Sequence, residues 1–228
     1  LAAMEVAADH LAGRELHIHP FFDKRPQGPA CEPDGERAGA ARELRSAPAC
    51  LVLVGADKGL CGAFNSNLIR AAAEWLKTRR GRKTYLVAVG RKGRDFARRV
   101  KGQDLELLSE LTGVFPKISF VHAELVGAAV IDAYLKTGVS TVTVLYNEFR
   151  SVAMQRLVAA PLLPIPTPEA PPEAAALPEY GFEPDRQALL AALLPRYAKA
   201  QLYRILLESQ AAELAARMNA MDSASKNA

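Results

Sequence analysis

The chain has 228 residues, of which 50% are hydrophobic and 24% charged, a composition typical of a folded globular protein and not of a disordered one. No apolar run reaches the roughly 20 residues that a membrane-spanning helix requires, and no signal-peptide pattern is present, so we expect a soluble or membrane-peripheral protein. The three cysteines have neither a Cys-x-x-Cys spacing nor a histidine at ligand spacing, which argues against a zinc site or a disulfide framework and favours a reducing compartment.

The first 48 residues predict a helix followed by an irregular linker. Residues 1–16 have a helical pattern of Leu, Val and Ala, and Pro20 ends it because the residue before a proline avoids the helical region. His17 and His19 form an i,i+2 pair without a third partner, so we interpret them as exposed polar residues and not as metal ligands. From residue 21 to 48, Pro, Gly, Glu and Arg dominate, which indicates a linker.

Residues 49–165 predict an α/β domain. Short apolar runs typical of buried strands alternate with helical patterns, which indicates a mainly parallel sheet covered by helices on both faces. The expected strands are 50–55, 84–89, 141–147 and 151–164, the expected helices are 65–77, 94–100 and 120–136, and 114–119 is ambiguous between strand and loop. We expect Asn65-Ser66-Asn67 to cap the first of these helices.

The turn from Gly55 to Gly62, between the first strand and the first helix of this domain, is the candidate ligand site. Glycine-rich turns before helices can bind phosphate, but this one lacks the G-x-G-x-x-G spacing and has Ala63-Phe64 where a Walker loop has Lys-Ser/Thr. Cys61 as a nucleophile would need a histidine, and the domain offers only His122. The pattern favours a structural turn, and a stand-alone nucleotide- or phosphate-binding α/β enzyme using this turn is the alternative.

Most of the net charge of +4 comes from a cluster of Lys and Arg between residues 77 and 101. No aromatic side chains interleave with the cluster as stacking platforms, and no nucleic-acid-binding motif accompanies it. The pattern therefore favours a solvated face. A nucleic-acid-binding module is the competing hypothesis, and it predicts an affinity that falls steeply with salt.

Residues 164–228 predict a Pro-rich connection followed by a long helix. Six prolines lie between 164 and 178, Asp185 is the expected N-cap, and Pro195 is expected to kink or restart the helix. From there to the last residue the helix would be roughly 50 Å long. Small side chains dominate one side at 198, 201, 205, 209, 212 and 216, and bulkier apolar ones follow another at 207, 214, 218 and 221. Such a helix needs more than one neighbour, and both chain ends look cut inside helices.

Eight segments resemble, in order, landmarks of one family. They are Ala3–Ala8, the turn Asp57-Lys58-Gly59-Leu60-Cys61-Gly62, Tyr146–Phe149, Leu162–Pro164, Phe182–Asp185, Leu193–Tyr197, Leu207–Ser209 and Ala216–Asp222. The turn is similar to an Asp-Arg/Lys-Gly-Leu-Cys-Gly signature. On these residues the chain resembles the gamma subunit of F-type ATP synthase, the central rotor stalk, truncated at both ends.

The resemblance implies a Rossmann-like α/β domain at 49–165, flanked by helices at 1–20 and 183–228 that form an antiparallel coiled coil, with a foot within 166–182. It implies a subunit without catalytic residues, cofactor or metal of its own. Such a subunit rotates within the hexamer of alpha and beta subunits and couples proton flow to ATP synthesis or hydrolysis on the beta subunits. The implied partners are these subunits, the epsilon subunit and the c-ring, without nucleic acid, at the cytoplasmic face of the bacterial inner membrane.

The resemblance also implies contact residues. Arg217 matches an arginine near the acidic catch loop of a beta subunit, and Met218 and Met221 would supply adaptable apolar contacts beside it. Tyr180 and Phe182 match the foot on the polar loops of the c-ring. The structural signature turn comprises Asp57, Gly59, Leu60, Cys61 and Gly62.

Overall fold

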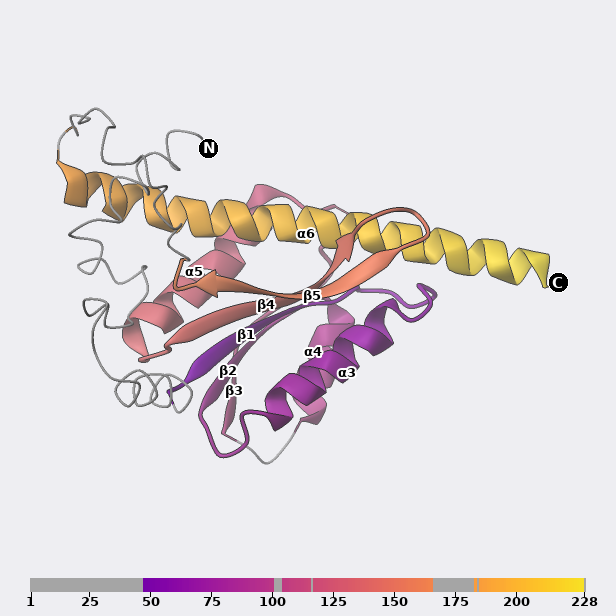
Figure 1. Cartoon of the computed structure of the whole chain (residues 1–228), viewed down its shortest axis with the longest axis horizontal. Helices are drawn as coiled ribbons and strands as arrows, with labels where there is room; N and C mark the ends of the chain where they lie inside the picture. The colour runs from indigo at the N-terminus through magenta and orange to yellow at the C-terminus, as the bar shows by residue number, and fades with distance from the viewer. Residues whose placement is uncertain (1–46, 101–103, 116, 166–182, 184, 228) are drawn as a thin grey trace, which may run out of the picture.

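A computed structural model of the chain describes residues 47–100, 104–115, 117–165, 183 and 185–227, and shows one sheet lying against a long helix (Figure 1). The strands are β1 Ala49–Val54, β2 Thr84–Val89, β3 Leu105–Leu111, β4 Thr141–Phe149 and β5 Gln155–Leu163. The helices are α3 Phe64–Lys77, α4 Arg91–Arg99, α5 Phe120–Lys136 and α6 Arg186–Lys226. The helix expected at 1–20, most of the linker expected at 21–48, and the foot residues Tyr180 and Phe182 lie outside the described residues.

The sheet has the strand order β3-β2-β1-β4-β5. β1 pairs with β2 and β4 in parallel, β2 pairs with β3 in parallel, and only β5 is antiparallel to its neighbour β4. Every residue of β1 and β2 is buried, as their continuous apolar runs predict for strands covered on both faces. The predicted mainly parallel sheet is therefore confirmed. The chain order reverses between β1 and β4, so their carboxyl ends mark the switch point where open α/β sheets bind ligands.

Alternate side chains of β1 belong to two different cores. Leu51 and Leu53 pack with Leu68 of α3 and Ala97 of α4 on one face. Cys50, Val52 and Val54 pack on the other face, in the cluster that contains Val130 of α5 and Leu202 of α6. Helices thus cover both faces of the sheet, with α3 and α4 on one side and α5 and α6 on the other (Figure 1). Because successive side chains of a strand point to opposite faces, one short apolar run serves both cores.

The sequence pattern does not predict the edge strand β3. Its sequence Leu-Glu-Leu-Leu-Ser-Glu-Leu has neither a continuous apolar run nor strict alternation, and a register irregularity opposite Leu86 and Val87 interrupts its pairing with β2. Two of its carboxylates pair with basic side chains, Glu106 with Lys83 and Glu110 with Arg98. Charged side chains on an edge strand limit its pairing with other chains.

The predicted starts of α4 and α3 are wrong, and so is the predicted restart of the last helix at Pro195. α4 begins at Arg91 instead of residue 94, directly after Gly90. α3 begins at Phe64, with Ala63 at its N-cap position and no side-chain cap, because the Asn65 side chain is engaged in the preceding turn. α6 begins where Asp185 caps it as predicted, accepting from the Ala188 N–H at 2.8 Å. It does not restart at Pro195 but runs unbroken for 41 residues.

α6 lies along β4 and crosses α5. At the crossing, a Cβ on Gly127 would lie 2.7 Å from Cγ of Lys199, so the two helices approach as closely as they do because residue 127 has no side chain. The predicted small side of α6 faces the domain: Ala198, Ile205, Ser209 and Ala212 are buried. The bulkier side is exposed, and the last turns of α6 project beyond the β4–β5 hairpin (Figure 1). Within the described ranges, no helix is long and apolar enough to span a membrane.

Candidate functional site

The signature turn leaves the carboxyl end of β1 and leads into α3. Leu60 has a φ of 61° and Gly62 a φ of 55°, so both residues adopt the left-handed conformation that favours glycine. Leu60 is 76% exposed, although a large apolar side chain gains from burial and a non-glycine residue with positive φ is strained. A strained, exposed leucine is a feature that the sequence pattern alone does not predict.

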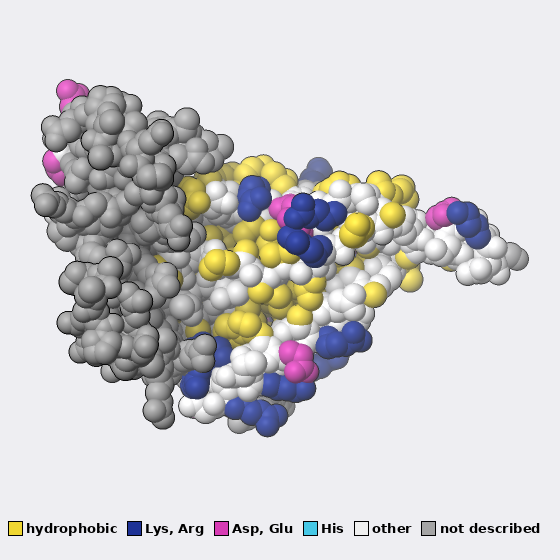
Figure 2. All heavy atoms as spheres, viewed as in Figure 1, with side chains coloured by type: hydrophobic (Ala, Val, Ile, Leu, Met, Phe, Trp, Pro, Cys, Tyr) yellow, Lys and Arg dark blue, Asp and Glu magenta, His cyan; other side chains and the backbone are white. Residues whose placement is uncertain are grey.

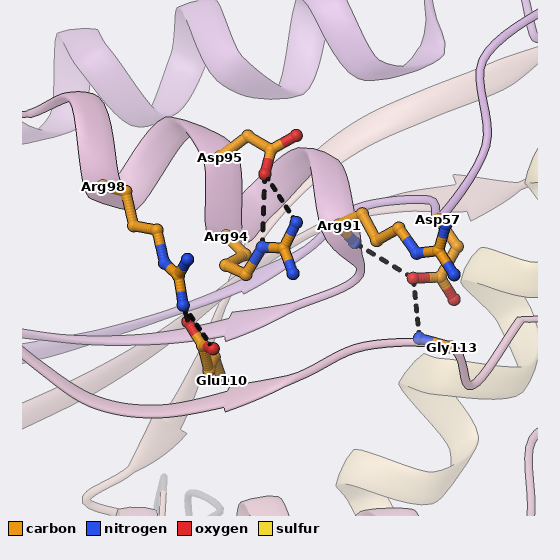
Figure 3. Close-up of polar contacts among 7 residues, drawn as sticks. All are labelled: Asp57, Arg91, Arg94, Asp95, Arg98, Glu110 and Gly113. Atoms are coloured by element: carbon orange, nitrogen blue, oxygen red, sulfur yellow. Dashed lines mark hydrogen bonds and ion pairs between the residues drawn. The ribbon is translucent and has the colours of Figure 1, made fainter.

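Asp57 ties this turn to two other loops. Its Oδ1 accepts from the backbone N–H of Arg91 at 3.1 Å and of Gly113 at 2.8 Å, and its Oδ2 accepts from the N–H of Phe115 at 3.0 Å. Figure 3 shows Asp57 between the start of α4 and the loop that holds Gly113. The carboxylate therefore joins the carboxyl ends of β1, β2 and β3.

Gly90 allows the loops to come this close. It has a φ of 83°, and a Cβ there would lie 2.0 Å from the carbonyl oxygen of Gly55, which no side chain tolerates. Two backbone hydrogen bonds join the same loops independently of Asp57: Gly55 N–H donates to Val89 O at 2.9 Å, and Gly90 N–H donates to Leu111 O at 2.7 Å.

The Asn65 side chain closes the turn from within. Its Oδ1 accepts from the Ala56 N–H at 3.1 Å, and its Nδ2 donates to Lys58 O at 3.3 Å and to Sγ of Cys61 at 3.1 Å. Burial raises the pKa of the Cys61 thiol, and the nearby Glu213 charge adds to the effect. A raised pKa disfavours the nucleophilic thiolate. The histidine that such a nucleophile would need is engaged at the start of α5, where His122 Nδ1 accepts from the Ser119 N–H at 3.0 Å.

α6 packs against the turn near the sheet's switch point. Ala212 of α6 lies in one cluster with Ala56, Cys61 and Phe64, and Ala216 packs against that cluster. A cavity of about 260 Å³ remains between α6, the start of α3 and the β4–β5 hairpin. Several amide side chains line it, among them Asn67, Asn147, Gln155 and Asn219. Within the described residues, no group of three His, Cys, Asp or Glu is placed to hold a metal ion.

A partly buried ion pair lies on α6 beside the turn. Glu213 is 3% exposed and pairs with Arg217 one helical turn later. Burial raises the pKa of Glu213, while the charges of Arg217 and Lys58 act in the opposite direction. Glu213 is not among the contact residues that the family resemblance implies. The signal that could have found it is its i,i+4 spacing to Arg217 on a helix.

The two predicted methionines lie on the exposed side of α6. Met218 is 55% exposed and Met221 is 44% exposed, on the same helix as Leu214 at 47%. Asn219 on the same stretch donates from Nδ2 to Val152 O at 2.5 Å, which joins α6 to the tip of the β4–β5 hairpin. The structure thus brings the signature turn, Arg217 and the hairpin together around the second half of α6.

The basic cluster lies on the opposite layer. Figure 2 shows Lys and Arg side chains over the α3 side of the molecule, and a second group of them together with hydrophobic side chains over α6. Some of these cations have carboxylate partners, as in Lys77 with Glu74 and Arg98 with Glu110. The other exposed ones are consistent with the solvated face that the sequence favours.

The fold and the site define an α/β protein organised around a long helix, in which three N–H donors at the sheet's carboxyl edge donate to Asp57 of the same chain. The sequence profile of a family described as ATP synthase matches residues 4–228. Over 185 residues the chain is 45% identical to the ATP synthase gamma chain of Elusimicrobium minutum, covering 78% of this chain and 60% of that protein. Over 199 residues it is 39% identical to the gamma chain of Moorella thermoacetica, covering 87% and 67%. The chain belongs to the ATP synthase gamma chain family, and it spans 60–67% of the length of these two relatives.

Solved structures share the fold at lower sequence identity. One is the central stalk and c-ring of the Tetrahymena thermophila mitochondrial ATP synthase, with a TM-score of 0.61 and 22% identity over 98% of this chain and 96% of the matched chain. Another is the rotor of the Euglena gracilis mitochondrial ATP synthase, with a TM-score of 0.60 and 17% identity over 99% and 80%. These likenesses support the predicted α/β fold with its long C-terminal helix.

Proposed function

We propose that the chain acts as the non-catalytic rotor stalk of the F1 sector of a proton-translocating ATP synthase, coupling proton flow to ATP synthesis or hydrolysis on the beta subunits. The carrying observation is the two-sided α6: one side is buried against the α/β domain, and the other exposes Leu207, Leu214, Met218 and Met221 along the projecting half. Membership of the gamma chain family supports the assignment.

In this proposal α6 contributes the contact with the beta subunits. Arg217 is held by Glu213 and is only about one-third exposed, so it presents a fixed positive charge rather than a freely moving one. Met218 and Met221 lie on the exposed stripe next to it, and thioether side chains adapt to a surface that changes as a shaft turns. We propose that Tyr180 and Phe182 form the foot on the c-ring. The protein would then be peripheral to the membrane, on its cytoplasmic face, with the epsilon subunit as a further partner.

The alternative, a nucleotide- or phosphate-binding enzyme, has less support. The N–H groups of Arg91, Gly113 and Phe115, which an incoming phosphate could use, donate to Asp57. Side chains of α6 cover the turn near the switch point, and a cavity of about 260 Å³ remains beside it. Calorimetric titration with ATP, NAD and FMN separates the two functions, because the stalk proposal predicts no tight binding to the isolated chain.

Association with purified alpha and beta subunits tests the proposal directly. The expected result is a complex of the chain with the alpha–beta hexamer, weakened by the double substitution Met218→Ser and Met221→Ser. A matched control on α5, Leu125→Ser with Leu135→Ser, removes apolar surface of similar exposure, 55% and 47%, and should leave the complex unchanged. Failure of the unmodified chain to associate, or equal weakening by both double variants, would contradict the proposal.

A further inference from the structure

The groups around Asp57 have the composition of an oxyanion-binding site. Three backbone N–H donors from two loops converge on one carboxylate at 2.8–3.1 Å. One of the donors, Arg91, is the first residue of α4, whose helix dipole also favours an anion. In other proteins, donors arranged in this way bind free phosphate or carboxylate ligands. In this chain the acceptor is covalently part of the protein.

The three backbone N–H donors compensate for the burial of the Asp57 carboxylate. Asp57 is only 7% exposed, and no Lys, Arg or His within the described ranges forms an ion pair with it. An ionised carboxylate out of water is costly unless hydrogen bonds replace its hydration. The three N–H groups supply that replacement, as the donors of an oxyanion hole do.

The donors are held in place without the help of Asp57. The hydrogen bonds from Gly55 N–H to Val89 O and from Gly90 N–H to Leu111 O already join the ends of β1, β2 and β3. Phe115 is buried in the main core, which fixes the loop that carries two of the donors. Losing the carboxylate would therefore leave unsatisfied N–H groups in a formed cradle.

We infer that the N–H groups of Arg91, Gly113 and Phe115 form an oxyanion site whose permanent ligand is the Asp57 carboxylate, and that removing this carboxylate opens the site to a small free carboxylate. Asp57→Ala retains Cβ and removes one carboxylate, so formate matches the missing group in size, charge and planarity. The inference is independent of the proposed rotor function, since it concerns a single chain.

Thermal unfolding of the whole chain in sodium formate and in sodium chloride of equal ionic strength tests the inference. Asp57→Ala should unfold at a lower temperature than the wild type, and formate should raise its midpoint by about 2–4 °C above the chloride value in a saturable manner. The wild type and Asp57→Asn should show no such difference, because their side chains still fill the site. Phosphate, which is larger than the missing group, should raise the midpoint of Asp57→Ala less than formate does.

If Asp57→Ala folds poorly, two further measurements keep the test decisive. The refolding yield of this variant should rise with formate and not with chloride. Carbon-13-labelled formate should show a saturable shift in its NMR signal with this variant only. Equal responses of the wild type and Asp57→Ala to formate in all these measurements would overturn the inference. So would an Asp57→Ala variant as stable as the wild type, because the cradle would then gain nothing from a carboxylate.

Discussion

The two halves of α6 contact the same domain through different chemistry. The first half buries five apolar side chains, Leu194, Ala198, Leu202, Ile205 and Leu206. The second half buries small or polar ones, Ser209, Ala212, Glu213 and Ala215. Four of the five in the first half reach the main core, whereas Ala212 reaches only the small cluster at the signature turn.

The first half of α6 anchors the helix to the domain, whereas the second half is held more weakly and exposes side chains. Each fully buried large apolar side chain contributes about 1.5–3 kcal/mol, whereas a partly buried ion pair such as Glu213–Arg217 contributes little net stability. Ser209 Oγ and Arg217 Nε are buried without a hydrogen-bond partner in the described part of the chain, which weakens the second half further. The weakly held half is the one that exposes Met218 and Met221. α6 is therefore fixed at one end and offers a surface at the other.

The largest expected effect comes from truncating the anchor. Leu202 is fully buried in the main core, so Leu202→Ala should lower the free energy of unfolding by about 2–5 kcal/mol. Leu214→Ala makes the same chemical change at a half-exposed position of the other half, and should cost less than about 1 kcal/mol. Urea denaturation of the two variants measures both values. Equal losses would remove the distinction between the halves.

The helix crossing sharpens the same comparison. Gly127→Ala places a Cβ 2.7 Å from Cγ of Lys199, so either the Lys199 side chain must change its conformation or α5 and the anchored half of α6 must move apart. Overpacking of this kind costs about 1–3 kcal/mol, and the better helix propensity of alanine offsets part of it. We expect a net loss of about 1–2 kcal/mol in urea denaturation.

A second substitution tests the cause of that loss. Lys199→Ala removes the atom that the new methyl group would meet, so the double variant should recover most of the stability lost in Gly127→Ala. A double variant whose loss equals the sum of the two single losses would show that the crossing is not limited by this contact.

Patterns that depend on neighbouring residues predicted much of this fold. The continuous apolar run Cys50–Val54 predicts a buried strand because the signal lies within the segment itself. Asp185 predicts a helix start because its side chain accepts a hydrogen bond from a residue three positions later. β3 escaped prediction because its single pairing with β2, across an irregular register, leaves a mixed polar pattern. The predicted restart at Pro195 is wrong because packing of α6 on the domain outweighs the local cost of a proline.

The candidate site was predicted only in part, for a similar reason. Motif likeness found the signature turn, and Asp57 within it, but not its role. The three donors to Asp57 are backbone groups 34 to 58 residues away, which leave no mark in side-chain identity. Asn65 was assigned to a helix cap because its position fits one, whereas the structure uses both ends of its amide within the turn. The assignment of Arg217, Met218 and Met221 to a beta subunit remains a prediction.

The buried carboxylate of the second half gives a smaller, pH-dependent effect. Because burial raises the pKa of Glu213, the folded chain takes up a proton at higher pH than the unfolded chain. The wild type should therefore gain stability relative to Glu213→Gln as the pH falls from neutral through this raised pKa. The gain should be complete below the unfolded value of about 4.3, and be lost again as the pH rises. Urea denaturation of the wild type and Glu213→Gln across this range measures the difference, and a difference that does not change with pH would contradict the prediction.

The smallest effect on stability is expected for the two exposed methionines of α6, whose substitution has the largest expected effect on function. Met218→Ser and Met221→Ser remove apolar atoms that are already half exposed, so together they should change the free energy of unfolding by less than about 1 kcal/mol. If urea denaturation instead shows a loss comparable to that of Leu202→Ala, these side chains stabilise the chain itself, and weaker association of the double variant with the alpha–beta hexamer could no longer be attributed to lost contact. A small loss in stability combined with weakened association would assign the exposed stripe of α6 to a partner.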